Sequence, residues 1–465
     1  MRAHPVLMLI VAATALRLVL AALLGLGIDE SYMVVAGRGP LEWGYFDHPP
    51  IAWWMARGMV DLAGTEAALV VRLPFIALFA LSSALMARLG TRLGGARAGF
   101  WAVVAFNLSP VFGLTTGSWV LPDGPLVCAL LGAALCAERA LATGAWRAWM
   151  GTGLCFGLAI LSKYTAALTG FGLVLYLLAT PGQRVWFARP QLYVAGLVAG
   201  LVFAPVVVWN AQHGFASLAF QSGRAAAASL HLFGPVVVLG GEALFVLPWI
   251  WLGLMRVGWP ALRGPAGAAR LLAFLAAPPI VLFAVVAIWS RQVLFHWAAP
   301  GYLMLYPALG VFLAARTWAP RAARVTAGLL GAVIVVALIA INLPLNLPKD
   351  PLLQARSWAG LRAALPDPST PVAALSWADA GKIGIGLGPD YRVVVLNRDA
   401  REFLFRPRPE PGSDVMIVAR GRSLAQMLDQ YGAGFADITE AGSVVISATR
   451  FTVFLGHQVM AWPAP

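Results

Sequence analysis

Acidic and imidazole side chains stand at a few points of a chain that is otherwise strongly apolar. Asp29 and Glu30 follow the first apolar segment, and the stretch GYFDHPP at residues 44–50 places Asp47 and His48 between an aromatic pair and two prolines. A carboxylate within hydrogen-bond reach of a hydroxyl can take its proton while the oxygen attacks an electrophilic carbon. These residues therefore predict general-base chemistry close to the end of the first apolar segment.

Cationic side chains and one further acid follow at the ends of later apolar segments. Asp123 lies in LPDGPL and Lys163 in LSKYTA, while Arg224, Arg291 and His296 lie in later polar gaps. A leaving group that gains negative charge is stabilised by cations or N–H donors placed where that charge grows. These cations, together with the imidazole of the first turn, are the candidates for binding such a group.

The same positions also have structural explanations. The acidic pair at 29–30 is equally explained as solvated residues at a helix end, and Asp123, before Gly and Pro, as a helix N-cap. Lys163 is explained as a side chain that reaches from an apolar helix to the membrane surface. For each of these residues the sequence leaves both explanations open.

Metal ligation has weaker support in the sequence. His213 and His296 have no His, Cys or acid at ligand spacing, which favours structural roles for both imidazoles. The three cysteines all lie inside apolar segments without metal-ligand spacing. Asp47 and His213 are the weak candidates for a divalent metal ion, and metal dependence stays open.

The composition predicts a helical membrane protein that positions these residues. Of 465 residues 60% are hydrophobic and 11% charged, and the mean hydropathy is +0.79. The apolar runs predict about eleven transmembrane helices of about 20 residues. They are expected at residues 5–27, 67–88, 98–114, 122–141, 147–163, 165–181, 190–209, 234–255, 271–290, 298–315 and 325–343.

The charge distribution predicts the orientation of these spans. The net charge of +13 comes mainly from arginines in alternate gaps between the apolar runs, the pattern of cytoplasmic loops rather than of nucleic-acid binding. The long gaps at 28–66 and 210–233 then lie outside. Residues 51–64, rich in Trp and Met, predict a helix in the plane of the membrane interface.

The composition changes after about residue 343. The proline-marked stretch PLNLPKDPLL predicts a linker, and RVVVLN, DVMIVAR, SVVIS and RFTVFLG predict strands mixed with helical stretches such as SLAQMLDQYG. The glycine-rich GKIGIGLGPD at 381–390 lacks phosphate-loop spacing and predicts a turn. We therefore expect a transmembrane domain over 1–343 and a small soluble α/β domain over 344–465, outside the membrane.

Charged residues inside apolar segments must pair, face a cavity or reach the interface. Arg17 lies midway along the first expected span and Glu242 inside the eighth. Pairing between these two side chains is one solution. A solute pathway through the membrane is another, and it keeps a lipid or solute transporter as an alternative function.

Three motifs in order resemble one family. The acidic pair after the first span, then GYFDHPP, then LPDGPL before the fourth span, resemble the polyprenyl-phosphate-dependent glycosyltransferases of the C-type membrane fold. The branch is that of bacterial relatives of protein O-mannosyltransferases, which includes the lipid A aminoarabinose transferases. The resemblance covers roughly the first 340 residues, and WNAQHGFASLAFQSGR and FHWAAPGYL resemble a bacterial subgroup.

The resemblance implies a role for several of the polar residues. Asp29 matches the catalytic aspartate of the first loop, with Glu30 beside it, and Asp123 matches the second acidic position of the family with Pro before it. The Asp-His of FDHPP stands where lipid A enzymes have Glu-Lys, which replaces a permanent cation with an imidazole. Tyr45, Asp47 and His48 are then expected at the site where the lipid phosphate enters.

The resemblance also implies the reaction and its partners. A sugar, hexose or pentose, would pass from a polyprenyl-phosphate donor to a hydroxyl of lipid A, another glycan or a protein, on the periplasmic face of the bacterial inner membrane. No nucleotide sugar, nucleic acid or certain cofactor is expected, and the surrounding membrane lipids are the other partners. A non-catalytic scaffold of a glycan assembly complex is the remaining alternative.

Overall fold

The computed structural model describes residues 4–226, 229–343, 350 and 352–462. Its contacts divide the chain into two units. The helical unit comprises Met1–Val19, Glu42–Ala52 and Leu73–Leu330, and the sheet unit comprises Leu20–Leu41, Trp53–Arg72 and Gly331–Pro465. Segments 20–41 and 53–72 thus pack with the C-terminal part, while the division at residue 343 stays a prediction. The expected linker PLNLPKDPLL lies largely outside the described residues.

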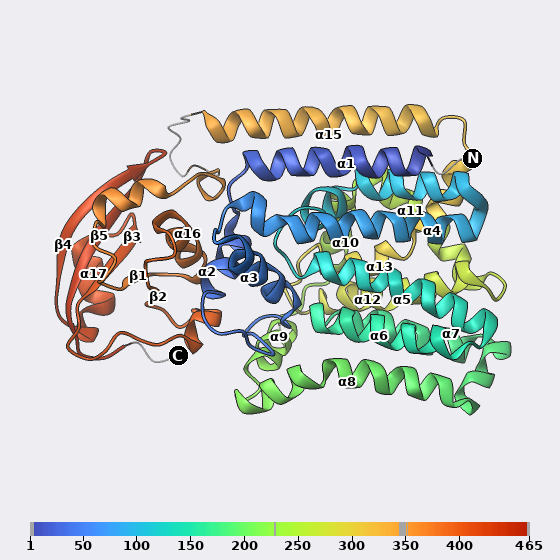
Figure 1. The fold of residues 1–465 in the computed structure, drawn as a ribbon, viewed down its shortest axis with the longest axis horizontal. Coiled ribbons are helices and arrows are strands. Elements are labelled where there is room, and N and C mark those ends of the chain that lie inside the picture. The colour runs from blue at the N-terminus through green and yellow to red at the C-terminus, as the bar shows by residue number, and fades with distance from the viewer. Residues whose placement is uncertain (1–3, 227–228, 344–349, 351, 463–465) are drawn as a thin grey trace. The chain divides into compact units, whose positions relative to one another are not determined.

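Helices make up most of the N-terminal two thirds of the chain (Figure 1). They are α1 (His4–Leu23), α4 (Ala68–Leu108), α5 (Asp123–Thr143), α6 (Trp146–Ser162), α7 (Ala166–Ala179), α8 (Pro190–Gln212), α9 (Ala216–Ala226), α10 (Gly234–Val246), α11 (Pro248–Arg263), α12 (Ala268–Val286), α13 (Ala299–Leu303), α14 (Tyr306–Ala314) and α15 (Ala319–Asn342). Two further helices, α2 (Ile28–Ala36) and α3 (Ile51–Ala63), follow α1, and a π-helix, η1 (Val111–Thr116), precedes α5.

Six helices in the described part of the chain are long and apolar enough to cross a membrane, or eight when each of two sharply bent pairs counts as one span. The expected number was about eleven. Three features account for the difference between eleven and eight. Two expected spans lie in the single element α4, the expected span at 298–315 is divided between α13 and α14, and α6 is only 17 residues long. The prediction of a multi-span helical membrane protein is confirmed.

α4 contains two of the expected spans in one 41-residue element. Its backbone leaves helical geometry at Gly94 and Gly95, and Gly95 has φ +81°, which favours glycine. On either side the chain packs against itself, because a Cβ at Gly90 would lie 2.9 Å from the Cα of Gly99. The expected break between residues 88 and 98 is therefore present as a reversal of the helix direction.

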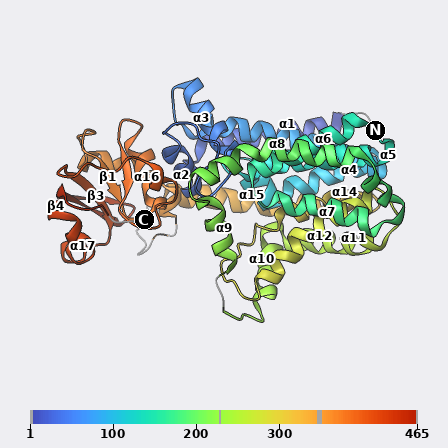
Figure 2. The same ribbon diagram turned by 90° about the horizontal axis from the view of Figure 1, so that it is seen from below.

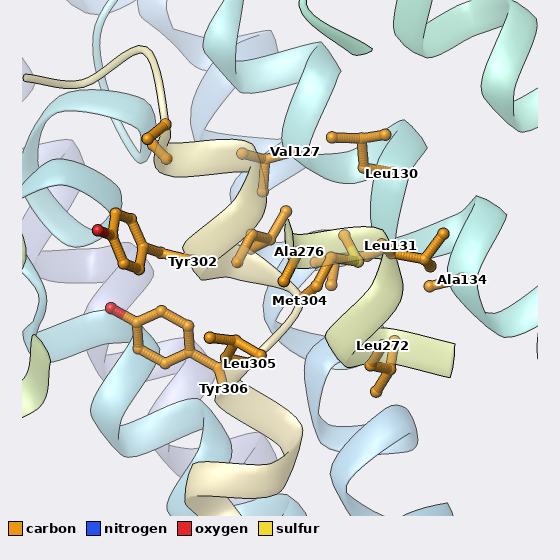
Figure 3. Close-up of a cluster of buried hydrophobic side chains, with 14 of the residues drawn as sticks. Val127, Leu130, Leu131, Ala134, Leu272, Ala276, Tyr302, Met304, Leu305 and Tyr306 are labelled. Atoms are coloured by element: carbon orange, nitrogen blue, oxygen red, sulfur yellow. The ribbon is translucent and has the colours of Figure 1, made fainter. Parts of the chain in front are cut away.

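One part of the core of the helical unit is formed by apolar side chains from α5, α12 and the α13–α14 region (Figure 3). Val127, Leu131 and Ala134 of α5 face this core, with Leu272 and Ala276 of α12 in the same cluster. α6 packs on both α5 and α8, and α7 packs on α12. This packing fixes the ends of α5 and α6, which carry two of the predicted site residues.

The C-terminal part forms a five-stranded mixed sheet in the order β2-β1-β3-β5-β4 (Figures 1 and 2). Its elements are β1 (Val372–Ala374), α16 (Trp377–Leu387), β2 (Val393–Val395), β3 (Val415–Arg420), α17 (Leu424–Tyr431), β4 (Phe435–Ile446) and β5 (Thr449–Val459). β1 pairs in parallel with β2 and β3, and β5 pairs antiparallel with β3 and β4. The small α/β domain is confirmed, and all four expected strand segments lie in strands.

The prediction of a turn over GKIGIGLGPD is wrong for residues up to 387, which form the C-terminal part of helix α16. Its glycines serve close packing on α2. A Cβ at Gly381 would lie 2.5 Å from the backbone nitrogen of Tyr32, and one at Gly384 would lie 2.5 Å from the side chain of Val35. The spacing of three residues places both glycines on one face of the helix.

Candidate active site

The GYFDHPP stretch forms a buried turn in the helical unit. The amide of Tyr45 donates to the carbonyl of His48 at 3.2 Å, and the side chains of Tyr45 and Asp47 are almost fully buried. Gly44 lies so close to α8 that a Cβ would be 2.7 Å from the ring of Trp209. Glycine at this position therefore permits the turn to lie directly on α8.

The turn also packs on α9, which belongs to the second long outer gap expected from the sequence. The rings of Phe46 and Phe220 lie 5.0 Å apart, and Gln221 Nε2 donates to the carbonyl of Asp47 at 2.5 Å. Two segments separated by some 170 residues in the chain are thus joined by backbone and aromatic contacts. The backbone carbonyl of Asp47, rather than its carboxylate, makes the bond to Gln221.

Asp123 and Lys163 form a close ion pair in the helical unit. Lys163 Nζ donates to both carboxylate oxygens of Asp123, at 3.0 and 3.1 Å. Asp123 is the first residue of α5 and Lys163 caps the end of α6, so the antiparallel packing of these helices brings the two together. The side chains are 15% and 9% exposed. Neither a helix N-cap at Asp123 nor a lysine extended into water describes this geometry.

Further charged groups surround this pair. His296, in the connection between α12 and α13, interacts electrostatically with Lys163, Asp123, Arg224 and His48. Burial lowers the pKa of His296 to about 4, and Lys163 contributes to the lowering. Its imidazole is therefore neutral near pH 7. We refer to Asp123, Lys163, His296, His48 and Arg224 as the polar cluster.

Arg224 lies at the edge of the polar cluster against aromatic side chains. Its guanidinium stands 4.4 Å from the ring of Trp297 and 5.6 Å from that of Phe220. These cation–π contacts hold the charge near His296. Arg291 is placed differently, because its Nε contacts the imidazole of His231 at 2.8 Å in an exposed position. The structure thus brings together every predicted cation except Arg291.

The predicted metal candidates are not arranged as a metal site. In the part of the chain that the structure describes, no three His, Cys, Asp or Glu side chains are grouped so as to hold a metal ion. His213 stacks on Trp209 with ring centres 4.2 Å apart, and its Nδ1 lies 2.8 Å from the Trp209 carbonyl. This geometry gives Asp47 and His213 no support as ligands.

In the sheet unit, Asp29 and Glu30 have contrasting surroundings. Both lie in the first turn of α2, but Asp29 is exposed and Glu30 is buried. The Glu30 carboxylate accepts from the amide of Gly27 at 2.8 Å and from Arg72 at 2.5 and 2.7 Å. Glu30 thus has the contacts of a structural residue, whereas Asp29 is exposed.

Sequence reasoning missed several residues that contact the predicted ones. Arg72 lies inside the expected span at residues 67–88. A charge inside an apolar span is the feature that singled out Arg17, and it singles out Arg72 equally. Tyr164 follows Lys163, and its hydroxyl lies 2.8 Å from Ser217 Oγ, near Asn210. No sequence signal identified Tyr164, because a tyrosine at a helix end is common in membrane proteins.

Arg17 and Glu242 do not pair with each other. Arg17 donates to the carbonyl of Gly113 at 3.0 Å and to the side chain of Asn107 at 2.9 Å. Glu242 accepts from the hydroxyl of Tyr302 at 2.5 Å. Gly113 belongs to the π-helix η1, so the buried guanidinium satisfies a carbonyl of an irregular segment.

The fold and the polar residues at the helix ends define a polytopic membrane protein with the architecture of C-type glycosyltransferases. Residues 47–209 match the family described as dolichyl-phosphate-mannose-protein mannosyltransferase, so the chain is similar to that family over this segment. The resemblance predicted from the three motifs is thereby confirmed.

Two solved structures share this fold over nearly the whole chain. The apo form of ArnT from Cupriavidus metallidurans is 17% identical with a TM-score of 0.67, covering 96% of this chain and 97% of that one. The form bound to undecaprenyl phosphate is 18% identical with a TM-score of 0.68 and covers all of both chains. At these identities the likeness establishes the fold.

One curated relative matches more of the sequence than the family model does. The lipid A galacturonosyltransferase RgtD from Rhizobium johnstonii is 23% identical over 270 residues, which make up 57% of this chain. The match spans about half the length of that relative, 55%.

Proposed function

We propose that this chain transfers a sugar from a polyprenyl-phosphate donor to a hydroxyl group of lipid A. The observation that carries the proposal is the polar cluster, in which the buried ammonium of Lys163 lies at the end of α6 and both Lys163 and Arg224 interact electrostatically with His296. The C-type fold, the ArnT structure that binds undecaprenyl phosphate and the likeness to RgtD support the choice of donor and acceptor.

In the proposed reaction the acceptor oxygen attacks the anomeric carbon of the sugar. The bond between that carbon and the phosphate oxygen breaks, and the polyprenyl phosphate leaves with the bonding electron pair. The proton of the acceptor hydroxyl passes to the carboxylate of Asp29, which is exposed and so accessible to it.

The leaving phosphate gains negative charge and needs no proton from an acid. An ammonium has three N–H donors, so the pairing of Lys163 with Asp123 leaves one for a phosphate oxygen. Asp123 then orients Lys163, and Arg224 adds a second positive charge. His296 is neutral near pH 7, so it acts as a hydrogen-bonding group and not as a cation.

The internal bonds of Arg17 and Glu242 remove the observation that favoured a transporter. Each of the two side chains is bonded to protein groups inside the helical unit. We place the reaction on the periplasmic face of the bacterial inner membrane, because the arginine-rich gaps then lie in the cytoplasm. The sheet unit would lie on the same periplasmic side.

The test is transfer by the purified protein in lipid nanodiscs. Undecaprenyl phosphates that carry a labelled hexose, hexuronic acid or pentose are supplied with lipid A, and nucleotide sugars serve as the control donors. The proposal expects label in lipid A from one lipid-linked donor and none from the nucleotide sugars. Transfer from a nucleotide sugar, or no transfer from any lipid-linked donor, contradicts it.

A further inference from the structure

The segment that joins α1 to α2 is held by buried charged side chains of the sheet unit. Arg72 donates to the carbonyls of Leu24 at 2.7 Å and Gly25 at 2.9 Å, and Glu30 accepts from the amide of Gly27. Lys382 Nζ donates to the carbonyl of Leu26 at 2.9 Å. Four successive residues directly before α2 thus have their backbone groups bonded by three charged side chains.

Lys382 comes from the distant C-terminal part of the chain. It lies on α16, its residue is only 3% exposed, and its Nζ makes a second bond to the carbonyl of Arg356 at 3.0 Å. Burial lowers its pKa to about 8, while the nearby Glu30 raises it and Arg72 lowers it. Keeping an ammonium in this position is costly, which indicates that the bonds it makes are useful.

The glycines of α16 allow Lys382 to reach this segment. Gly381 and Gly384 bring the backbone of α16 against α2, where any side chain would meet Tyr32 or Val35. α2 itself has nine residues, and isolated helices of that length are unstable in water. Its conformation, and hence the direction of Asp29 in its first turn, depends on the groups that hold its start.

We propose that α16 positions Asp29 for catalysis, with Lys382 as a positioning residue that holds the carbonyl of Leu26 just before the start of α2. This inference rests on the proposed function, in which Asp29 is the general base. The C-terminal domain then takes part in catalysis without touching the substrate. A misplacement of about 1 Å at a reacting group can cost about 10²-fold in rate.

The experiment compares a substitution on α16 with a control substitution on β3 in the full-length protein. Lys382→Met removes the donors that bond residue 26. Arg420→Met is the matched control, because it removes an ion pair to Asp379 of α16 at 2.7 Å and leaves the α1–α2 segment unchanged. Gly384→Ala is the second test variant, because it displaces α16 from α2 without altering charge.

Two readouts separate positioning from general stability. Hydrogen–deuterium exchange should rise at least about fivefold in peptides covering residues 24–31 of Lys382→Met and Gly384→Ala. The start of α2 should open more often once the carbonyl of Leu26 has lost its donor or α16 no longer packs closely on α2. The transfer kcat should fall about 10- to 100-fold with the donor KM nearly unchanged. Arg420→Met should change neither quantity.

Unchanged exchange at residues 24–31 together with unchanged kcat in Lys382→Met would overturn the inference. So would equal effects of Lys382→Met and Arg420→Met, because the lysine would then contribute only to domain stability. Failure of the proposed function gives a different pattern. In that case Asp29→Asn retains full activity, while exchange at residues 24–31 still rises in Lys382→Met.

Discussion

Lys163 donates to both carboxylate oxygens of Asp123 across the antiparallel helices α5 and α6, and both side chains are largely buried. A buried pair of this kind is strongly destabilised when one partner is removed, because the remaining charge has no compensation. Removal of both charges avoids that penalty. The pair therefore allows the structural and the catalytic roles of Lys163 to be separated.

We predict that Lys163→Gln lowers the free energy of unfolding by about 3 kcal/mol and the transfer rate by about 10²–10³-fold. The double variant Asp123→Asn with Lys163→Gln should recover most of the stability and little of the rate. Lys163→Arg should keep part of the activity, because it retains the charge with a different geometry. Thermal unfolding in detergent measures the stability, and initial rates at matched protein level measure the transfer. Recovery of the rate in the double variant would assign Lys163 a purely structural role.

The contact between the GYFDHPP turn and α8 predicts a second effect. Gly44→Ala places a methyl group 2.7 Å from the ring of Trp209, so the turn or the ring must move. Crowding of this kind costs about 1–3 kcal/mol of stability, and the shift of His48 should also lower the transfer rate. Gly200→Ala, on helix α8 that carries Trp209, is the control, because no atom lies within 4 Å of its added methyl group. Equal thermal stability of the two variants would show that the turn does not depend on this contact.

The neutral state of His296 predicts a pH effect on stability. Its pKa is about 4 in the folded protein, lowered chiefly by burial from an ordinary 6.5, with Lys163, Arg224 and His48 lowering it and Asp123 opposing. Between these values the unfolded chain binds the proton more readily, so folding stability falls as the pH decreases from about 6.5 toward 4. Above pH 6.5 the contribution of His296 to folding stability does not change with pH.

His296→Gln should remove this part of the acid sensitivity, because an amide does not titrate. We expect the difference in melting temperature between wild type and variant to be constant above pH 6.5 and to narrow or change sign at pH 4.5. Melting curves in detergent at half-unit pH steps provide the measurement. If the melting temperatures of wild type and variant fell in parallel between pH 6.5 and 4.5, His296 would titrate normally.

The orientation of the sheet unit can be tested at an exposed position of β4. A cysteine at Ala441, in a variant without Cys128, Cys136 and Cys155, should react with a membrane-impermeant thiol reagent in cells with a permeabilised outer membrane. Ser423 is less suitable, because its side chain caps α17. A cysteine at Ala142 is the control and should react only after lysis. Ala142 lies near the C-terminal end of α5, and Asp123 lies at its N-terminal end. The reverse labelling pattern would invert the topology and place the proposed site in the cytoplasm.

Much of the fold could be predicted because hydropathy and strand patterns are local. The segments RVVVLN and DVMIVAR form β2 and β3 as expected, and SLAQMLDQYG contains α17. The turn expected at residues 381–387 was wrong because tertiary packing decided it. Glycine disfavours an isolated helix, but here two glycines allow α16 to contact α2 closely.

The candidate site could be predicted as a set of residue types but not as contacts. Asp123 and Lys163 were recognised separately, while their pairing depends on the register of α5 against α6. The bond between Glu30 and Arg72 joins residues 42 positions apart and has no local signal. Burial, which makes His296 neutral, is likewise a property of the folded chain.

The rate of sugar transfer by Asp29→Asn tests the central claim most directly. The substitution keeps the shape of the exposed side chain in the first turn of α2 and removes its basic oxygen. Asp61→Asn, at a 53% exposed acid of α3, is the matched control and should retain the wild-type rate. We predict that Asp29→Asn lowers the rate by about 10²–10⁴-fold while donor binding persists. A wild-type rate in Asp29→Asn would contradict the assignment of Asp29 as the general base.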